Sequence, residues 1–400
     1  MTTAVEGHQF IDRASASLEL EGGPEQVFPS VTLIVVNHNG RSKLKGLLDH
    51  CLSSLLKTDY PNFEIIFVDN ASSDGTPEYV EAEFGSKRIQ IVRLESNIGY
   101  SGATNYAIGL ARGDIIGVLN NDIAVIDTSW LSTLVKFMME EPGISIVSPA
   151  LLWDDNRIDS LGGEVNVLMI AWDAHSRESF EGRDRRPILA LSPPGAAFLF
   201  RRAVAEKFRN EIFESDYFAY YEDVCLGLKM NLMGERVAVV PQSQIRHRRG
   251  SSWGLFSPRK FALMRRNSIW TGITIFETRQ VLALLPVWLG STFYGSLVYY
   301  RLTKDPRFFL VPFRVVGEVL LSMPKVWARH QEFHCRRNME TSALRFSRNL
   351  ILDSEKLTFF RRMALAAINA MIRLSGLSKF TITRLKRYPL VDPTYLAQDN

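Results

Sequence analysis

The feature that most constrains how this chain folds is an alternation of short apolar runs with amphipathic stretches, which begins at residue 31. Four apolar runs predict buried strands, at 31–36, 64–68, 89–94 and 115–119. Apolar residues at helical spacing follow each of the first three runs. Helices are predicted at 44–56 and at 101–111, and between them a helix is predicted to begin with Thr76 as N-cap and Pro77 at its first position. This order predicts an α/β fold in which helices flank a mostly parallel sheet.

The pattern continues less regularly to about residue 260. Further strands are predicted at 144–148, 196–200 and 237–240, with helices at 129–140, capped by Ser129, and at 223–233, ended by Gly234. Residues 150–191 show no clear periodicity, so we expect an irregular segment that covers the functional site. We predict a flexible tail at 1–30, a catalytic domain at 31–260 and a helical C-terminal region at 261–400.

The C-terminal region combines apolar and basic residues. Residues 281–300 contain no charged side chain, a length that suits a membrane span, but Pro286 weakens that interpretation. Residues 308–327 are apolar with three charged interruptions, and 356–387 form a basic amphipathic stretch. Two interpretations stay open: a soluble helical subdomain, or a membrane-associating region that lies on, dips into or spans the bilayer.

Charge is distributed unevenly along the chain. Residues 301–400 carry 18 Lys and Arg against 8 Asp and Glu, a net charge of +10, so the total of +4 leaves −6 on the first 300 residues. The basic residues alternate with large apolar ones and match no nucleic-acid-binding motif, so no nucleic acid partner is expected. An anionic membrane surface is the expected partner.

The cysteines and the start of the chain bear on the compartment. The three cysteines are far apart and lack zinc-ligand spacing, so we expect neither disulfides nor a zinc site. Residues 1–30 lack the basic start and apolar run of a signal peptide. We therefore expect no signal peptide and a protein on the cytoplasmic face of the membrane, peripheral or monotopic. Homo-oligomer formation is left open.

Polar clusters follow each of the four predicted parallel strands. They read Asn-His-Asn-Gly at 37–40, Asp-Asn-Ala-Ser-Ser-Asp-Gly at 69–75, Asn-Ile-Gly-Tyr at 97–100 and Asn-Asn-Asp at 120–122. Ligands of open α/β sheets bind at the carboxyl ends of strands, so all four clusters are expected at one edge. Asp69 suits an acceptor for a nucleotide base or ribose, or else it shapes a turn; Asp74 is assigned to the turn.

Asp122 and His247 are candidate metal ligands. Asp122 follows the fourth strand, where a carboxylate suits Mg²⁺ or Mn²⁺, although Asn-Asn-Asp is also good turn composition. His247 follows the last predicted strand and would complete such a site. The neighbouring basic run at 246–249 offers contacts to phosphate, or it is a solvated surface loop.

An acidic pair, Glu222 and Asp223, begins a predicted helix. A helix N-terminus keeps a carboxylate ionised, so that it can take a proton from a hydroxyl. Acidic residues at a helix start also act as caps, and this segment alone does not separate the two roles.

Taken in order, these clusters resemble family 2 glycosyltransferases of the GT-A fold, in particular the rhamnosyltransferase-like branch. The resemblance rests on five motifs, at 31–39, 68–76, 97–100, 119–122 and 221–223, and covers about residues 30–255. It implies an inverting enzyme that transfers a single sugar from a nucleotide-diphosphate sugar to an acceptor hydroxyl. The expected acceptor is a lipid-linked or cell-envelope glycan.

The resemblance also implies roles for individual residues. Asp223 is the expected catalytic base, with Glu222 orienting the acceptor. Asp122, joined by His247, is the expected ligand of Mg²⁺ or Mn²⁺. The expected donor-binding residues are Val36, Asn37, Asn39, Asp69, Asn97, Gly99, Asn121 and Gly195.

The sequence departs from the family pattern at two places. The first acidic position of the Asp-x-Asp motif is Asn120, so the metal is expected to depend on Asp122, His247 and the diphosphate itself. Processive synthases carry Gln-x-x-Arg-Trp after the base, whereas residues 265–270 read Arg-Arg-Asn-Ser-Ile-Trp. Single-sugar transfer is therefore expected.

Two alternatives stay open. A polyprenyl-phosphate sugar synthase would use the same donor site with a phosphate acceptor. A membrane-anchored scaffold with a degenerate transferase fold would have no activity, and the presence of Asp69, Asp122 and Asp223 argues against it. A dinucleotide-dependent oxidoreductase is excluded, because residues 37–40 offer no Gly-x-Gly-x-x-Gly loop.

Overall fold

A computed structural model of the chain shows two compact units. The first holds Met1–Gly163, Asp173–Asn231 and Glu235–Ser252, and the second holds Glu164–Trp172, Leu232–Gly234 and Trp253–Asn400. The structure describes residues 4–5, 8–11, 28–44, 46–85, 88–248, 257–352 and 359–387. Most of the tail predicted at 1–30 lies outside these ranges.

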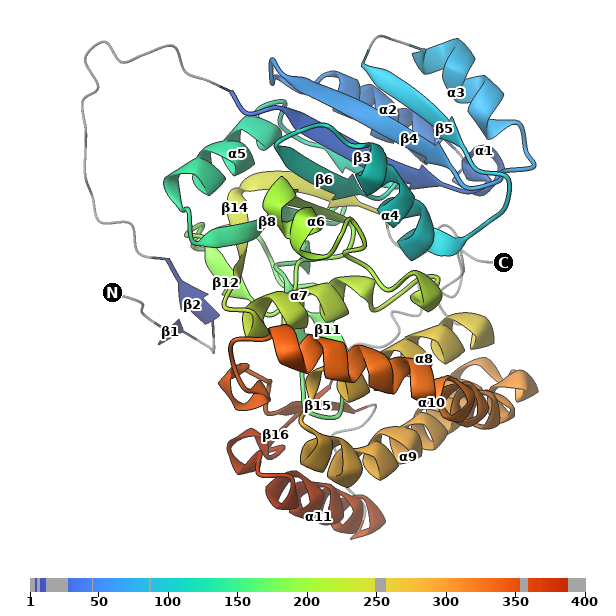
Figure 1. The fold of residues 1–400 in the computed structure, drawn as a ribbon, viewed down its shortest axis with the longest axis vertical. Helices are drawn as coiled ribbons and strands as arrows, with labels where there is room; N and C mark the ends of the chain where they lie inside the picture. Colours follow the sequence, from blue (N-terminus) through green and yellow to red (C-terminus); the bar gives the residue numbers. More distant parts are fainter. Residues whose placement is uncertain are drawn as a thin grey trace. The chain divides into compact units, whose positions relative to one another are not determined.

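The first unit is built on a mixed sheet flanked by helices (Figure 1). Its strand order is β1-β2-β12-β14-β8-β13-β6-β3-β4-β5, with β7 paired to β14 and β9 paired to β8. The parallel part consists of β3 (Val31–Asn37), β4 (Phe63–Asp69), β5 (Ile89–Arg93) and β6 (Ile115–Leu119). Since these four strands are parallel, their carboxyl ends meet at one edge, which confirms the predicted arrangement.

The remainder of the sheet mixes both directions. β13 (Ala197–Arg201) runs antiparallel to β6 and to β8 (Ile144–Leu152), while β14 (Arg236–His247) runs parallel to β8. The other strands of this sheet are β1 (Ala4–Val5), β2 (His8–Phe10), β7 (Ile123–Val125), β9 (Ile158–Ser160) and β12 (Ile188–Ala190). A separate two-stranded sheet pairs β10 (Gly163–Val165) with β11 (Ala171–Asp173).

The expectation of an irregular segment at 150–191 is wrong. Four short strands, β9 to β12, lie within it, and β8 extends into it as far as Leu152. Each short strand has three residues, which is too few to show an alternating pattern in the sequence.

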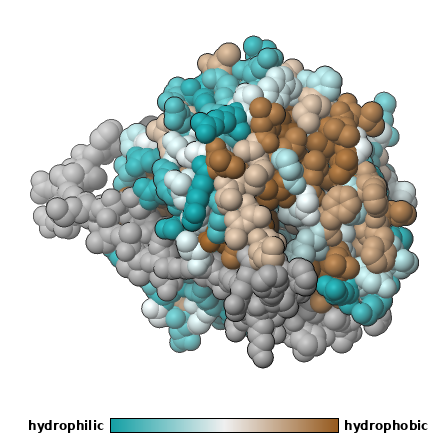
Figure 2. All heavy atoms as spheres, turned by 90° about the horizontal axis from the view of Figure 1, so that it is seen from below, coloured by the Kyte–Doolittle hydropathy of each residue, from teal (hydrophilic) through white to brown (hydrophobic). Residues whose placement is uncertain are grey.

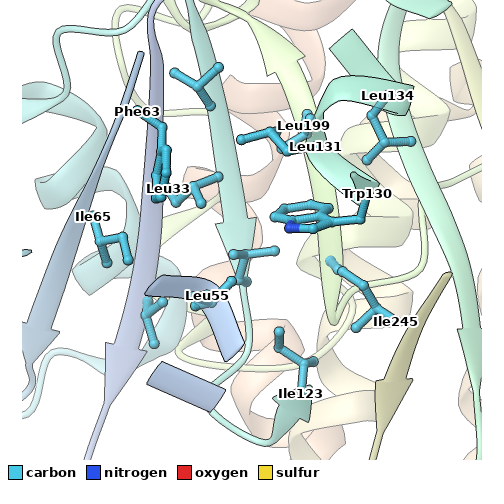
Figure 3. Close-up of a cluster of buried hydrophobic side chains, with 14 of the residues drawn as sticks. Leu33, Leu55, Phe63, Ile65, Ile123, Trp130, Leu131, Leu134, Leu199 and Ile245 are labelled. Carbon is cyan, nitrogen blue, oxygen red and sulfur yellow. The ribbon is translucent and has the colours of Figure 1, made fainter. Parts of the chain in front are cut away.

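Helices bury both faces of the parallel strands, so alternate residues of β3 belong to different cores. Leu33 packs with Trp130 and the residues of α2 and α5, as Figure 3 shows for part of this cluster. Ile34 faces the opposite way, toward α4, α6 and α7. The helices of this unit are α1 (Gly40–Lys43), α2 (Leu47–Leu56), α3 (Thr76–Phe84), α4 (Gly99–Leu110), α5 (Trp130–Glu140), α6 (Arg202–Lys207) and α7 (Glu222–Leu232), with the 3-10 turn η1 (Ser215–Tyr217).

Two predicted element ends differ from the structure. Gly75, not Thr76, is the N-cap of α3; it has a φ of 74°, and Thr76 is the first helical residue. β14 does not end at Pro241 but continues to His247, with a register shift between Val240 and Gln244. A break in the pairing there accommodates a proline, which has no N–H to donate. Ser129 is the N-cap of α5, as predicted.

The second unit is mainly helical. Its helices are α8 (Pro258–Ile275), α9 (Thr278–Thr303), α10 (Val311–Arg336) and α11 (Phe359–Leu374), with 3-10 turns η2 (Pro306–Phe309), η3 (Thr341–Ala343) and η4 (Ser378–Phe380). A small parallel sheet pairs β15 (Asn349–Leu352) with β16 (Arg384–Arg387). Among the described helices, α9 alone is long and apolar enough to cross a membrane by length and composition.

Candidate active site

The carboxyl ends of β3 and β4 place Asn37 beside Asp69. The two residues are paired in register, and Asn37 Nδ2 donates to Asp69 Oδ1 across 3.3 Å. Both side chains are buried. Asp69 Oδ2 also accepts from the backbone N–H of Ser72 at 2.9 Å, which is the turn-shaping role. A carboxylate oxygen can accept more than one hydrogen bond, so binding of the donor by Asp69 stays a prediction.

Asn121 connects the end of β6 to this pair. Its Nδ2 donates to Asn37 Oδ1 across 2.8 Å. Asn39 lies beside them in the left-handed region, with a φ of 57°, and its Oδ1 accepts from the backbone N–H of Ser73 at 2.7 Å. Val36, the residue before Asn37 in β3, is buried at the same edge. The first, second and fourth polar clusters are therefore in contact.

Asn70 connects the third cluster to the second. Its Nδ2 donates to Asn97 Oδ1 and to the Gly99 carbonyl, each at 3.1 Å, and its Oδ1 accepts from the backbone N–H of Ile98 at 3.0 Å. Asn97 Oδ1 also accepts from the Gly99 N–H at 3.0 Å. The structure thus gives Asn97 and Gly99 a structural role at the site, alongside their predicted contact with the donor.

The turn at Gly99 packs against the segment before the acidic pair. A Cβ at Gly99, which has a φ of 81°, would lie 2.5 Å from the Phe218 carbonyl oxygen. Phe218, Tyr220 and Tyr221 all have positive φ values, 66°, 71° and 75°. Such a conformation costs an aromatic residue about 1–3 kcal/mol and is concentrated at functional sites. The strained backbone therefore marks this segment as a functional candidate.

Glu222 and Asp223 begin α7, at its positive N-terminal end. Burial, reinforced by the charge of Asp223, raises the pKa of Glu222 to about 8. The Oε2 atom of Glu222 has no hydrogen-bond partner among the residues that the structure describes. The raised pKa favours the protonated form of Glu222 at neutral pH, which suits a hydrogen bond from Glu222 to a ligand.

Gly195 lies against the carboxylate of Asp223. A Cβ built on Gly195 would be 2.6 Å from Asp223 Oδ2, closer than carbon and oxygen approach without a bond. The predicted small residue and the predicted base are therefore neighbours. The space beside the Asp223 carboxylate exists because Gly195 has no side chain.

Two tyrosines lie within the electrostatic influence of both the acidic pair and Asp122. Burial raises the pKa of Tyr100 well above its usual value, and the charges of Glu222, Asp223 and Asp122 raise it further. Burial also raises the pKa of Tyr220, again with contributions from Glu222 and Asp122. Carboxylates from the end of β6 and from the start of α7 thus act on the same phenols.

His247 lies at the end of β14 between two carboxylates. Its Nε2 is 3.4 Å from Asp122 Oδ1, and its Nδ1 is 2.7 Å from Asp159 Oδ2. Burial lowers the pKa of His247, but Asp122 and Asp159 outweigh that effect and raise it to about 9. The structure therefore brings together the two residues predicted to bind a metal.

The donor set of Asp122 and His247 fits a divalent cation. Neighbouring ligands of an octahedral Mg²⁺ at about 2.1 Å lie roughly 3 Å apart, close to the 3.4 Å between these atoms. Within the described ranges no group of three His, Cys, Asp or Glu residues is arranged to hold a metal. The other ligands would be substrate oxygens or water, as the asparagine at position 120 implies.

The basic run at 246–249 is divided in the structure. Arg248 is half-exposed and pairs with Asp154 at 2.7 Å, as a solvated surface residue does. Arg246 is part of β14, and Arg249 lies outside the described residues.

Sequence reasoning assigned no role to Asn70, Tyr100 or Asp159. Asn70 and Tyr100 belong to strand-end clusters, so their position next to Asp69 and Gly99 was a usable signal. Asp159 had no such signal, because it lies in the segment that was expected to be irregular.

A comparison with protein families places the fold. Residues 32–209 match the model described as glycosyl transferase family 2. The structure is similar to that of GalNAc-T7, solved with UDP, GalNAc and Mn²⁺, at a TM-score of 0.51 and 14% identity, covering 75% of this chain and 58% of the other. This likeness concerns the fold.

Curated relatives are similar to part of the chain. An uncharacterized protein of Sinorhizobium fredii is 27% identical over 253 residues (61% of this chain, 27% of the relative). The O-antigen biosynthesis protein RfbC of Myxococcus xanthus is 28% identical over 236 residues (57% of this chain, 18% of the relative). The N-acetylglucosaminyl-diphospho-decaprenol L-rhamnosyltransferase of Mycobacterium tuberculosis is 27% identical over 233 residues (52% of this chain, 73% of the relative).

The chain spans 27% and 18% of the length of the first two of these relatives. The family match at 32–209 contains the parallel strands and their polar ends. Through these residues the chain is similar to glycosyl transferase family 2, and its first unit has the GT-A fold.

Proposed function

We propose that this chain transfers a single sugar from a nucleotide-diphosphate sugar to an acceptor hydroxyl, with inversion at the anomeric carbon. One observation carries the proposal: Asp122 from the strand-end side and Glu222 from the helix side act on the same two partly buried tyrosines, Tyr100 and Tyr220. A donor held at the strand ends would therefore reach the candidate base, Asp223.

The donor would bind along the edge formed by β3, β4 and β6. Asn37, Asp69 and Asn121 present amide and carboxylate groups there, which suit the base and ribose of a nucleotide. The solved structure of similar fold contains UDP and Mn²⁺, which supports the same classes of ligand here.

Asp122 and His247 would hold Mg²⁺ or Mn²⁺. When bound, the cation neutralises charge on the diphosphate that leaves. His247 binds a metal only as neutral imidazole, so Asp159, which accepts from Nδ1, would fix the tautomer that leaves Nε2 available.

The chemical step would use the acidic pair. Asp223 takes the proton of the acceptor hydroxyl, whose oxygen then forms a bond to the anomeric carbon. The bond from that carbon to the diphosphate breaks, and the nucleotide diphosphate leaves with the electron pair. Attack from the opposite face inverts the configuration. Glu222, protonated at neutral pH, would donate a hydrogen bond that orients the acceptor.

The relatives support a cell-envelope acceptor, either a lipid-linked intermediate or a growing glycan. One relative is named for O-antigen biosynthesis, and another for rhamnosyl transfer to a decaprenol-linked sugar. We include in the proposal a location on the cytoplasmic face of the membrane, where such an acceptor would be reached.

The C-terminal helices support transfer of one sugar at a time. Arg265, in the stretch that departs from the processive signature, is buried in α8 and donates to the Trp288 carbonyl of α9 at 3.1 Å. Arg266 lies over the Trp270 ring, 4.3 Å from its centroid. These residues have packing roles within the second unit.

The alternatives have less support. A polyprenyl-phosphate sugar synthase would need cations for its phosphate acceptor, but Arg248 pairs with Asp154. An inactive scaffold would not require Gly195 to leave space at Asp223.

The proposal is tested by a donor screen. The purified chain is mixed with nucleotide-diphosphate sugars, Mn²⁺ and envelope lipid extracts, and released nucleotide is measured. We expect release from one donor class that depends on both metal and acceptor. If no donor is turned over or bound, the scaffold alternative is correct.

A further inference from the structure

Helix α9 buries one side and exposes an apolar side. On the buried side, Trp288 is fully enclosed and its Nε1 donates to the Val167 carbonyl at 3.0 Å, within the second unit. On the other side, Leu282, Phe293 and Leu297 are 71%, 44% and 36% exposed. A helix at the surface of a soluble protein normally exposes polar residues, whereas the exposed side of α9 carries large apolar ones.

The exposed side of α10 and the preceding turn is apolar too. Leu310, Phe313, Leu320 and Leu321 are 70%, 67%, 61% and 86% exposed. The Phe313 ring contacts the Phe293 ring of α9, with centroids 5.6 Å apart.

A second aromatic contact joins α9 to the turn η2, which precedes α10. Tyr300 of α9 and Phe309 of η2 have ring centroids 4.4 Å apart. Figure 2 shows hydrophobic side chains gathered into a broad area on the right of the face seen from below. We call the following exposed apolar residues of α9, η2 and α10 the α9–α10 surface: Leu282, Phe293, Leu297, Phe309, Leu310, Phe313, Leu320 and Leu321.

Contiguous apolar surface of this kind marks an interaction site. Its surroundings are basic: Thr278–Arg336 carries eight Lys and Arg residues against three Asp and Glu residues. Arg301 and Lys304 are exposed at the end of α9, where it meets the turn. Large exposed apolar side chains bordered by cations match a membrane interface with anionic lipids.

The packing of α9 distinguishes lying on a membrane from crossing it. α9 packs against α8, α10 and α11. Arg265 of α8 donates to Ser291 Oγ at 2.6 Å and to Thr292 Oγ1 at 3.3 Å. A helix surrounded by lipid would lose these bonds, and a charged guanidinium would be left in hydrocarbon.

α10 argues in the same direction. It carries Arg314 and Glu318, which pair at 2.7 Å on a partly exposed side. An ion pair of this exposure suits the level of lipid headgroups.

From these observations we infer that the α9–α10 surface docks flat onto an anionic membrane, with its apolar side chains at the headgroup boundary and its cations on phosphate groups. The inference rests on the membrane location included in the proposed function. It defines which residues make the contact, and it excludes α9 as a transmembrane span.

The test is cosedimentation of the full chain with lipid vesicles, which requires neither donor nor acceptor. We expect binding to vesicles containing phosphatidylglycerol and weak binding to phosphatidylcholine alone. The variant Leu310→Ser, Phe313→Ser, Leu321→Ser should bind at least about tenfold more weakly, because three exposed anchors are lost. Arg301→Gln with Lys304→Gln should weaken binding only to the anionic vesicles.

The matched control is Tyr106→Ser with Met139→Ser, which removes two hydrophobic side chains that are 51% and 54% exposed in the first unit. It should bind vesicles as the wild type does. Nucleotide binding should be unchanged in all variants, so loss of docking and failure of the proposed function are distinguishable. Wild-type binding by the triple variant overturns the inference. So does a variant that loses only self-association, since the surface would then join two copies.

Labelling separates docking from spanning. In a Cys335→Ser background, single cysteines replace Arg279 and Lys304, near the two ends of α9, and the protein is bound to the outside of vesicles. An impermeant thiol reagent added outside should modify both positions. Protection of one of them alone would show that α9 crosses the bilayer.

Discussion

At Gly195 one hydrogen atom separates the backbone from the Asp223 carboxylate. Gly195→Ala would place a methyl group 2.6 Å from Asp223 Oδ2, so the carboxylate must move. A displacement of this size at a reacting group costs on the order of 10²-fold in rate. We expect kcat to fall to that extent with little change in melting temperature.

Gly109→Ala is the control for this substitution, because a Cβ there meets nothing within 4 Å. It should keep full activity and gain about 0.5–1 kcal/mol of stability from its helical position. Equal activity in the two variants would mean that the Asp223 carboxylate is not confined by Gly195.

Glu222 makes stability depend on pH. Its pKa rises from 4.5 in the unfolded chain to about 8 in the folded one, so between these values only the folded chain keeps the proton. Stability is therefore full below pH 4.5 and falls as the pH rises toward about 8. The melting temperature of Glu222→Gln should therefore rise relative to that of the wild type as the pH increases through this range. If the melting temperatures of the variant and the wild type depend on pH in the same way, Glu222 ionises normally.

Asp159 is expected to position His247 for the metal. Removing a carboxylate that holds a ligand histidine lowers metal affinity by about 10–100-fold. Calorimetric titration of Asp159→Asn with Mn²⁺ should show that loss, while Asp154→Asn, which removes the partner of Arg248, should not. Unchanged Mn²⁺ affinity in Asp159→Asn would leave His247 positioned by other contacts.

At the scale of elements, Asn70 holds the end of β4 to the start of α4. Asn70→Ala leaves the buried Gly99 carbonyl and the partly buried Ile98 N–H without this partner. An unsatisfied buried group costs about 1–3 kcal/mol, so urea unfolding should show a loss of that order. Asn62→Ala, which removes one exposed hydrogen bond, should be near neutral. A neutral Asn70→Ala would indicate that the turn is held by its other contacts.

The sequence was sufficient to predict the parallel strands, because β3, β4 and β6 are buried along nearly their whole length and read as apolar runs. The edge strand β5 is only partly buried but is still mostly apolar. β3, β4, β5 and β6 all lie where the runs at 31–36, 64–68, 89–94 and 115–119 predicted them. Short strands such as β9 and β12 were missed, since three residues show no period. The continuation of β14 past Pro241 was missed for another reason: a proline usually ends a strand.

The candidate site was predictable where it follows strands and not where pairing across the sheet creates it. Asn37 and Asp69 end adjacent strands, so their contact follows from the parallel order. The contact between His247 and Asp159 depends on β9 pairing with β8, and no local pattern specifies that pairing.

At the scale of the whole molecule, the division of the chain is less simple than the predicted boundary at 260. The second unit begins at Trp253 but also includes Glu164–Trp172 and Leu232–Gly234. The Leu232 carbonyl accepts from the backbone N–H groups of Asn338 and Met339, at 2.9 and 3.0 Å. A deletion of the C-terminal residues would remove these partners, so point substitutions are the cleaner probes of membrane binding.

All residues of the candidate site belong to the first unit, and the account requires that they act together. Asp223→Asn preserves the shape of the side chain and removes its capacity to take a proton. Loss of a general base costs about 10²–10⁴-fold in rate. Sugar transfer and nucleotide affinity should therefore be measured in the same preparation of this variant. The account predicts transfer reduced by about 10²–10⁴-fold with nucleotide affinity nearly unchanged; transfer at the wild-type rate would contradict it.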